Sequence, residues 1–249
     1  MSRNFELLQN LGREPKLFST AVLPARDGTE RQSSKLFAND FGVDPEINRL
    51  CQRLFVGGAD AAEARVVTFC SVQPGVAEGE ICAHTAITLA ARVNRSVCVV
   101  DSNLLSPSLH KFFGVSNLSG FSEAAMSDST LSSHARQIGG SNLTLITAGG
   151  AMPDSQVAQS ESTAFRLREL RSHFDYVLIN GPTVPDRGQA TFLGRLSDGI
   201  VLILEANSTR RDTAMQVRIE MEQANVPVLG AVLNNRTFPI PDALYSKLF

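Results

Sequence analysis

The sequence predicts an α/β protein with a doubly wound, mostly parallel β-sheet flanked by helices. Short apolar runs alternate along the chain with longer segments of helical periodicity, which is the β-α repetition of such sheets. Several apolar runs are continuous rather than alternating, as is typical of strands buried on both faces. In this fold class ligands bind at the carboxyl ends of the strands, so the residues that follow each run are the first candidates for a site.

The individual elements follow from these runs. The predicted strands are residues 65–71, 97–101, 143–147, 175–180, 199–205 and 228–234. The segments with helical periodicity are residues 46–55, 80–94, 106–113, 155–173, 187–196 and 209–224. Parallel strands need crossover connections of this length, so the order of the elements agrees with the fold class.

The chain is predicted to consist of a flexible N-terminal arm, residues 1–43, and a single α/β domain, residues 44–249. The arm is polar, with scattered charges and no sustained period. Order is expected to begin at Asp44 and Pro45, a good N-cap followed by a good first helical residue. The helix that follows has apolar residues at i, i+3, i+4, i+7 and i+8 from Ile47, which predicts one buried face.

Composition excludes several classes of function. The formal net charge is −2, so no overall field attracts nucleic acid or an anionic membrane. No apolar run reaches the ~20 residues of a membrane helix, so direct membrane insertion is not expected. Four cysteines (Cys51, Cys70, Cys82 and Cys98) lie in apolar patterns without metal-ligand spacing. They are predicted to be reduced core thiols of a cytoplasmic protein.

The segment after the first predicted strand of the domain is where a phosphate-binding loop belongs. It reads PGVAEGE, from Pro74 to Glu80. A phosphate loop works through backbone N–H groups and a helix N-terminus, reinforced by a lysine on the phosphates. Gly75 and Gly79 permit an unusual backbone conformation. However, the loop has no lysine, and two glutamates, Glu78 and Glu80, lie where the lysine is expected.

A series of stretches resembles the cytoplasmic domains of the bacterial tyrosine kinases (BY-kinases) of polysaccharide export. In family order and spacing they are VVTFCSVQPG, VCVVDSNLLSPSLHKFFGVSNLSGFSEA, LTLITAGGAMPD, FDYVLINGP, LSDGIVLILEANSTRRD and VPVLGAVLNN, between about Glu46 and Tyr245. BY-kinases belong to the MinD/ParA-like, deviant Walker A branch of the P-loop proteins. The resemblance implies a P-loop NTPase-like fold, with ATP and Mg as the cofactors of active members.

Under this resemblance, the residues that depart from the family pattern are those of the loop that would bind phosphate and magnesium. Counted without gaps, Gly75 takes the first loop glycine, Ala77 the second, Glu78 the lysine and Gly79 the hydroxyl residue that binds magnesium. In a register shifted by two, Gly79 is the second glycine and Glu80 takes the lysine position. Either register puts a carboxylate where the family has a cation, so no cofactor is expected unless the degenerate site still binds ATP/Mg.

Further departures fall at the strand ends. Asp101 matches the first acidic residue after the second strand, Asn103 takes the next acidic position, and Asn180 takes the Walker B aspartate. Asn234 matches a position that contacts adenine in related nucleotide-binding proteins. The resemblance therefore implies a vestigial nucleotide site in which Asp101 is the remaining metal ligand. The residues alone leave alternatives open: Asp101 and Asn234 as strand-end caps, and Asn180 as ordinary turn chemistry.

The two loop glutamates also have two readings. They fit solvated first-turn residues favoured by the helix dipole. Alternatively, one carboxylate folds into the amide nest and acts as an internal phosphate surrogate. The sequence does not decide whether Glu78 or Glu80 would fill it.

Assembly signals are partial. The family's oligomerisation motif, Glu-x-x-Arg-x-x-Arg, is approximated by Glu46, Arg49 and Arg53, with the second arginine one residue late; a solvated helix face is the alternative. The C-terminal tail has Tyr245 alone where autokinases carry a tyrosine cluster.

The sequence thus predicts a pseudoenzyme: a non-catalytic BY-kinase-like regulator or scaffold in exopolysaccharide or capsule biosynthesis and export. The expected partner is a membrane polysaccharide co-polymerase or an active kinase paralogue, with homo-oligomers also compatible, in the cytoplasm or peripheral to the inner membrane through that partner. One alternative is an active, atypical tyrosine kinase or ATPase that uses Arg210 or Arg211 on the phosphates. A second is a MinD/ParA-type positioning protein.

Overall fold

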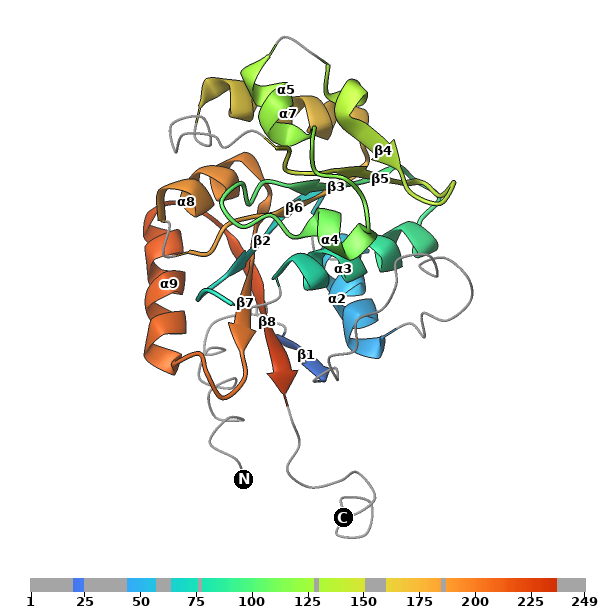
Figure 1. Cartoon of the computed structure of the whole chain (residues 1–249). Helices are drawn as coiled ribbons and strands as arrows, with labels where there is room; N and C mark the ends of the chain where they lie inside the picture. Colours follow the sequence, from blue (N-terminus) through green and yellow to red (C-terminus); the bar gives the residue numbers. More distant parts are fainter. Residues whose placement is uncertain are drawn as a thin grey trace.

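The computed structural model describes residues 20–24, 44–56, 64–75, 78–127, 130–150, 160–184 and 187–236. Within these residues eight strands form one sheet in the order β1-β8-β7-β2-β6-β3-β5-β4 (Figure 1). The strands are β1 (Thr20–Pro24), β2 (Val66–Ser71), β3 (Val97–Asp101), β4 (Ala135–Gln137), β5 (Leu143–Ile146), β6 (Tyr176–Asn180), β7 (Gly199–Glu205) and β8 (Val228–Arg236). Neighbouring strands are parallel except β4 and β5, so the predicted fold class is confirmed.

Helices cover both faces of this sheet (Figure 1). They are α2 (Pro45–Phe55), α3 (Glu78–Arg92), α4 (Leu109–Phe113), α5 (Phe121–Met126), the short 3-10 helix η2 (Leu131–His134), α7 (Glu161–His173), α8 (Arg187–Leu196) and α9 (Arg211–Gln223). Side chains of α2, α3 and α4 form one core cluster with one face of the sheet, and side chains of α5, α7, α8 and α9 form two clusters with the other.

The strands are apolar throughout because they bury both faces. In β3, Val99 belongs to the cluster under α2 and α3, whereas the next residue, Val100, belongs to the cluster under α5 and α7. The same alternation separates Leu178 from Ile179 in β6. All four side chains are fully buried, each worth about 1.5–3 kcal/mol relative to exposure. A continuous apolar run is therefore the pattern that this two-sided sheet requires.

The strand β1 was not predicted, since it lies within residues 1–43, expected to be a flexible arm. It pairs in parallel with β8, with Thr20 opposite Ala231 and Val22 opposite Leu233. A strand of five residues at the sheet edge is formed by backbone pairing with β8, and its sequence, TAVLP, is too short to give a period. The rest of the predicted arm lies outside the described residues.

Three other elements were missed for the same reason of length. The strand β4 has three residues, η2 has four and α5 has six. The predicted helix 155–173 begins at Glu161 in the described residues, where the Ser160 side chain caps it by accepting a hydrogen bond from the backbone N–H of Thr163 at 3.2 Å. A Ser N-cap with Glu161 in the first turn is a favourable helix start.

The four cysteines are free and buried, as predicted. Burial raises the pKa of the Cys51 thiol to about 12, and it also raises the pKa of the other three thiols. These thiols are therefore protonated and act as small apolar core side chains. Separately, none of the helices in the described ranges combines the length and hydrophobicity of a membrane span.

Candidate functional site

The candidate site lies at the carboxyl ends of β2, β6 and β3, which are neighbours in the sheet. Asp101 at the end of β3 is paired in register with Asn180 at the end of β6. Asn180 is in turn opposite Phe69, which lies two residues before the end of β2 and the loop that leads into α3. The sheet thus brings together residues that lie far apart along the chain, at the edge where doubly wound folds bind ligands.

Glu78 is the first residue of α3, and its carboxylate points inward. The residue is only 8% exposed, and Oε1 accepts a hydrogen bond from Asn103 Nδ2 at 3.1 Å. Burial raises the pKa of this carboxyl; hydrogen bonds from its own backbone N–H, from Asn103 and from the Ser71 hydroxyl partly offset the effect. Glu80 is exposed. Glu80 is therefore a solvated first-turn residue, and only Glu78 lies among the buried polar residues of the candidate site.

Asp101 is completely buried, and its carboxylate accepts four hydrogen bonds. Oδ2 accepts from the backbone N–H groups of Ser108 and Leu109, both at 2.9 Å. Oδ1 accepts from Asn180 Nδ2 at 2.9 Å and from the backbone N–H of Asn103 at 3.2 Å. Burial raises the pKa of this carboxyl, against the lowering effect of these donors. Asp101 therefore ties the start of α4 to the ends of β3 and β6, as a strand-end cap does.

Asn103 connects the two carboxylates. Its backbone N–H donates to Asp101, its amide Nδ2 donates to Glu78, and its Oδ1 accepts from the backbone N–H of Ser106 at 3.1 Å. The residue is 3% exposed, and all of these bonds hold the loop that follows β3. An aspartate here would lack the Nδ2 donor that Glu78 uses.

Gly79 and Ser108 fit together closely, a contact that sequence reasoning missed. A Cβ atom placed on Gly79 would lie 2.0 Å from Ser108 Oγ and 3.0 Å from Ser108 Cβ. Ser108 Oγ accepts a hydrogen bond from Asn180 Nδ2 at 3.3 Å, while Asn180 Oδ1 is buried without a partner in the described part of the chain. The side chain of Ser108 thus occupies the space beside α3 that any residue larger than glycine would need.

The remaining predicted site residues lie further out. Gly75 has a left-handed φ of +82°, and a Cβ there would meet no atom within 4 Å. Ala77 lies outside the described residues. Asn234, in β8, is 7% exposed, and its Nδ2 donates weakly to Glu205 Oε2 at 3.4 Å, beside a shorter bond from Asn235 to Glu205 Oε1 at 2.8 Å. These contacts tie the ends of β7 and β8 together.

The cluster contains two carboxylates and no cation. Among the described residues, no Lys or Arg side chain donates to Glu78 or Asp101. Arg210 and Arg211 are exposed at the start of α9. Because the Asp101 oxygens are occupied by backbone and amide donors, this carboxylate has little capacity left for a metal ion or for general-base chemistry.

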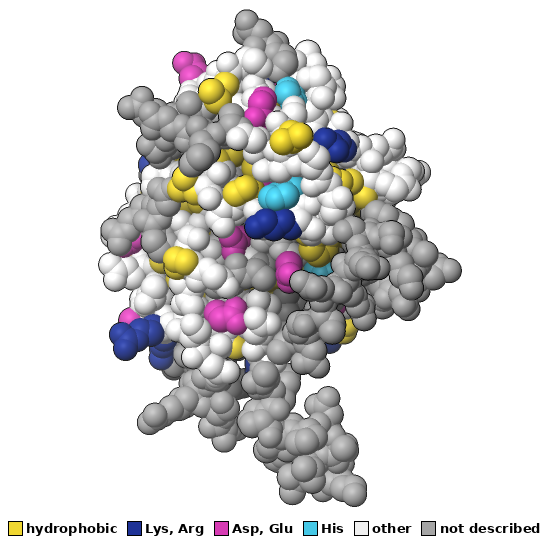
Figure 2. All heavy atoms as spheres, viewed as in Figure 1, with side chains coloured by type: hydrophobic (Ala, Val, Ile, Leu, Met, Phe, Trp, Pro, Cys, Tyr) yellow, Lys and Arg dark blue, Asp and Glu magenta, His cyan; other side chains and the backbone are white. Residues whose placement is uncertain are grey.

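Among the described residues on the face seen in Figure 1, the basic side chains form no continuous patch. Figure 2 shows the Lys and Arg side chains of that face as separate spots, with small groups of apolar side chains between them. Leu105, in the loop after β3, is 71% exposed, and Leu118 is 83% exposed. Residues 102–108 include no Lys or Arg, so this loop adds no positive charge to the cluster.

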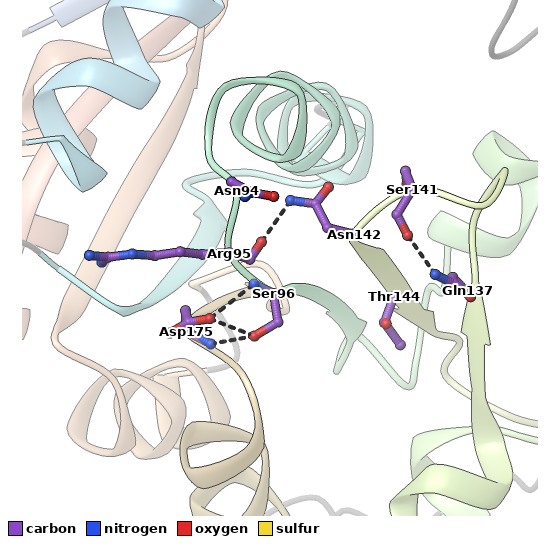
Figure 3. A pocket seen from close by; sticks show the side chains of 8 residues that line it. All are labelled: Asn94, Arg95, Ser96, Gln137, Ser141, Asn142, Thr144 and Asp175. Carbon is purple, nitrogen blue, oxygen red and sulfur yellow. Dashed lines mark hydrogen bonds between the residues drawn. The ribbon is translucent and has the colours of Figure 1, made fainter.

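A polar hollow of about 420 Å³ lies at the opposite ends of the strands from the candidate site, where β3, β5 and β6 begin (Figure 3). Its walls are bonded to one another. Asn142 Nδ2 donates to the Arg95 carbonyl at 2.7 Å, and Asp175 accepts from the backbone N–H and the hydroxyl of Ser96 at 3.0 and 2.8 Å. These side chains fasten the connections between the strands, so we assign the hollow a structural role.

The predicted assembly motif lies on α2. Arg49 Nη1 forms an ion pair with Glu46 Oε1 at 2.7 Å within the helix, and the Arg49 side chain is 63% exposed. Arg53 is exposed one turn further on. The helix packs its apolar face on α3, and the charged side chains line its outer surface.

Relatives among characterised proteins cover most of this domain, although no protein-family model matches the chain. The chain is 28% identical to CapB of Staphylococcus aureus over 153 residues, which are 61% of this chain and 67% of that protein. It is 22% identical over 175 residues to the tyrosine-protein kinase YwqD of Bacillus subtilis strain 168, or 70% of this chain and 73% of YwqD. It also matches 23% of the length of ExoP, the succinoglycan biosynthesis transport protein of Rhizobium meliloti strain 1021, with 23% identity over 74% of this chain.

Solved structures show the same fold. The chimerical protein CapA2B2 superposes with a TM-score of 0.78 at 19% identity, over 94% of this chain and 99% of that one. The kinase domain of the Escherichia coli tyrosine kinase ETK gives 0.75 at 19% identity, over 97% and 98% of the two chains. The septum site-determining protein MinD from Pyrococcus horikoshii, complexed with Mg-ADP, gives 0.56 at 21% identity, over 73% and 76%. The chain is therefore a homologue of the bacterial tyrosine kinases and has the P-loop fold of their kinase domains.

Proposed function

We propose that this chain is a degenerate BY-kinase-like protein that does not transfer phosphate and that acts as a regulator or scaffold in exopolysaccharide or capsule biosynthesis and export. The observation that carries the proposal is the buried Glu78 carboxylate at the start of α3, bonded to Asn103 at 3.1 Å. A phosphate loop needs a cation at its phosphates, and here the loop ends in an anion that is fixed inside the site.

The reversed charge opposes nucleotide binding strongly. Two unit charges about 4 Å apart interact by ~1 kcal/mol at ε ≈ 80 and by ~4 kcal/mol at ε ≈ 20. Replacing a cation by an anion changes the interaction with each nearby phosphate charge by twice that, about 2–8 kcal/mol. Each 1.4 kcal/mol is about tenfold in affinity, so the penalty is at least an order of magnitude. The chain has four lysines, and the one in the described residues, Lys111, is exposed on α4.

The support for a bound magnesium ion is equally weak. Gly79 offers no hydroxyl, Asn180 offers an amide in place of a carboxylate, and Asp101 already accepts four hydrogen bonds. Magnesium prefers carboxylates and substrate phosphates in near-octahedral geometry. Because phosphoryl transfer depends on positioning and on charge neutralisation, the loss of both removes the catalytic contribution of this site.

The proposed partner is a membrane polysaccharide co-polymerase or an active kinase paralogue, bound through residues 1–45 and α2. Two observations support this assignment. The relative ExoP is named for succinoglycan biosynthesis transport, and the outer surface of α2 carries the exposed Arg49 and Arg53. The chain would then work in the cytoplasm, peripheral to the inner membrane through its partner. A homo-oligomer formed through the same helix is compatible with these features.

Calorimetry tests the loss of function. The full chain is titrated with Mg-ATP, and the same preparation is assayed for autophosphorylation and ATP turnover. The expected result is no saturable heat and no product. Binding of Mg-ATP at micromolar affinity would contradict the proposal, and turnover that disappears in Asp101→Ala and Arg210→Ala variants would establish the active alternative in its place.

A further inference from the structure

In the candidate site, each buried carboxylate accepts a hydrogen bond from one side-chain amide. Glu78 faces the amide of Asn103, and Asp101 faces the amide of Asn180. Ser108 completes the group by accepting from the same Asn180 amide. We refer to these five residues as the acid–amide clasp. It joins α3, the loop after β3 and the end of β6, none of which are adjacent in sequence.

We propose that the acid–amide clasp is a co-adapted internal ligand, in which Glu78 occupies the anion position of the loop and fastens the start of α3 to the ends of β3 and β6 without nucleotide or metal. The inference rests on the proposed function, since it takes the start of α3 as the phosphate position. Its consequence is a site whose shape does not depend on a bound ligand, so contacts with a partner would not be gated by nucleotide.

The hydrogen-bond donors and acceptors of the clasp are complementary. A carboxylate only accepts hydrogen bonds when ionised, whereas an amide nitrogen donates two. If residue 103 were aspartate, its carboxylate would face that of Glu78 over the 3.1 Å contact. If residue 180 were aspartate, it would face Asp101 over the 2.9 Å contact. Two close carboxylates repel each other unless a cation lies between them or one of them is protonated. No cation contacts this cluster among the described residues, so an amide at each position suits the acid opposite it.

The clasp is also buried. Asp101 and Asn180 are fully buried, Asn103 is 3% exposed and Glu78 is 8% exposed. Water therefore cannot replace a lost partner, and buried polar groups of this kind are costly when left unpaired. The groups that face Glu78 are those of Asn103 and Ser71, with the Asp101 carboxylate nearby, and none of them is a cation.

A polarity swap tests the coupling between Glu78 and Asn103. Thermal unfolding at pH 7 is measured for the full chain, for Asn103→Asp, for Glu78→Gln and for the double variant. In the double variant the new amide at position 78 can donate to the new carboxylate at position 103, so the bond is retained with its direction reversed. We expect Asn103→Asp to lower Tm by about 5 °C or more in the parent chain and by less than half as much in the Glu78→Gln background.

The matched control is Glu80→Gln, the same chemical change two residues along the same helix at an exposed position. In that background Asn103→Asp should cost as much as in the parent chain. An equal loss of Tm in all three backgrounds would overturn the proposal. If Asn103→Asp alone fails to fold, a folded double variant supports the clasp, and failure of both variants refutes it.

The same samples separate this inference from the proposed function. Each variant is also heated with Mg-ATP. A rise in the Tm of the parent chain on adding Mg-ATP would contradict the proposed function. An absence of coupling between residues 78 and 103, with no response to Mg-ATP, would remove the clasp and leave the non-catalytic assignment standing.

Discussion

The close contact between Gly79 and Ser108 predicts that alanine at position 79 lowers the stability of the protein. Replacing glycine by alanine inside a helix is ordinarily stabilising by up to about 1 kcal/mol, and less in the first turn. At Gly79 the added Cβ would lie 2.0 Å from Ser108 Oγ and 3.0 Å from Ser108 Cβ. The Ser108 hydroxyl would have to rotate away and lose its bond from Asn180 Nδ2, and the tight contact with Cβ would remain.

The expected free-energy changes decide whether Gly79→Ala stabilises or destabilises the protein. Overpacking of this kind costs about 1–3 kcal/mol, and the lost hydrogen bond about 0.5–1.5 kcal/mol, which together exceed the gain in helix propensity. Gly79→Ala should therefore lower Tm, by about 2–4 °C for each kcal/mol in a domain of this size. In a Ser108→Gly background both obstructing atoms are gone, so the same substitution should become neutral or stabilising.

The assay is a double-mutant cycle by urea and thermal unfolding of the parent chain, Gly79→Ala, Ser108→Gly and the double variant. Ala91→Ser, on the exposed face of the same helix, is the control for α3 and should change stability by less than about 0.5 kcal/mol. A Gly79→Ala variant that is stabilised equally in both backgrounds would refute the steric reasoning, because Ser108 would then not fill the space beside α3.

Three further predictions concern the carboxylates. Burial raises the folded-state pKa of the Glu78 carboxyl above its ordinary 4.5, so the contribution of this group to the free energy of unfolding is complete below pH 4.5 and is lost as the pH rises through the raised pKa. Glu78→Gln should therefore raise Tm at pH 7 and change it little near pH 4. The same change in Tm at both pH values would contradict this prediction. Glu78→Ala, which leaves Asn103 Nδ2 without its partner, should cost about 1–3 kcal/mol in urea unfolding, whereas Glu80→Ala should be close to neutral. Equal effects would show that the bond between Glu78 and Asn103 does not stabilise the fold. Asp101→Asn should cost about 2–4 kcal/mol, because one amide oxygen cannot serve the donors of Ser108, Leu109, Asn103 and Asn180, and an unchanged urea midpoint would refute its role as a cap.

The positions of the strands could be predicted from sequence because two-sided burial leaves a direct trace. The runs that end at Asp101 and Asn180 are continuous and apolar, and the structure ends β3 and β6 at these residues. The strand β1 left no such trace, since its place depends on the edge of β8, near the other end of the chain.

The chemistry of the loop could be predicted only in part. Two glycines and an alanine allow two registers, so the sequence places a carboxylate near the phosphates without deciding which one. In the structure Glu78 is 8% exposed and Glu80 is exposed, so Glu78 is the glutamate that lies among the buried polar residues. The role of Ser108 has no periodic signal, because its contact with Gly79 joins residues distant in sequence through the packing of α3 beside the loop after β3. The missing side chain at Gly79 was the one available hint.

Native mass spectrometry of the full chain, purified without added nucleotide and then incubated with Mg-ATP, shows whether the site binds a nucleotide. We expect the mass of the polypeptide alone, or of its oligomer, both before and after incubation, because the buried Glu78 carboxylate, bonded to Asn103, would repel a phosphate at the start of α3. A stoichiometric adduct with the mass of a nucleotide, present on purification or formed with Mg-ATP, would contradict this expectation.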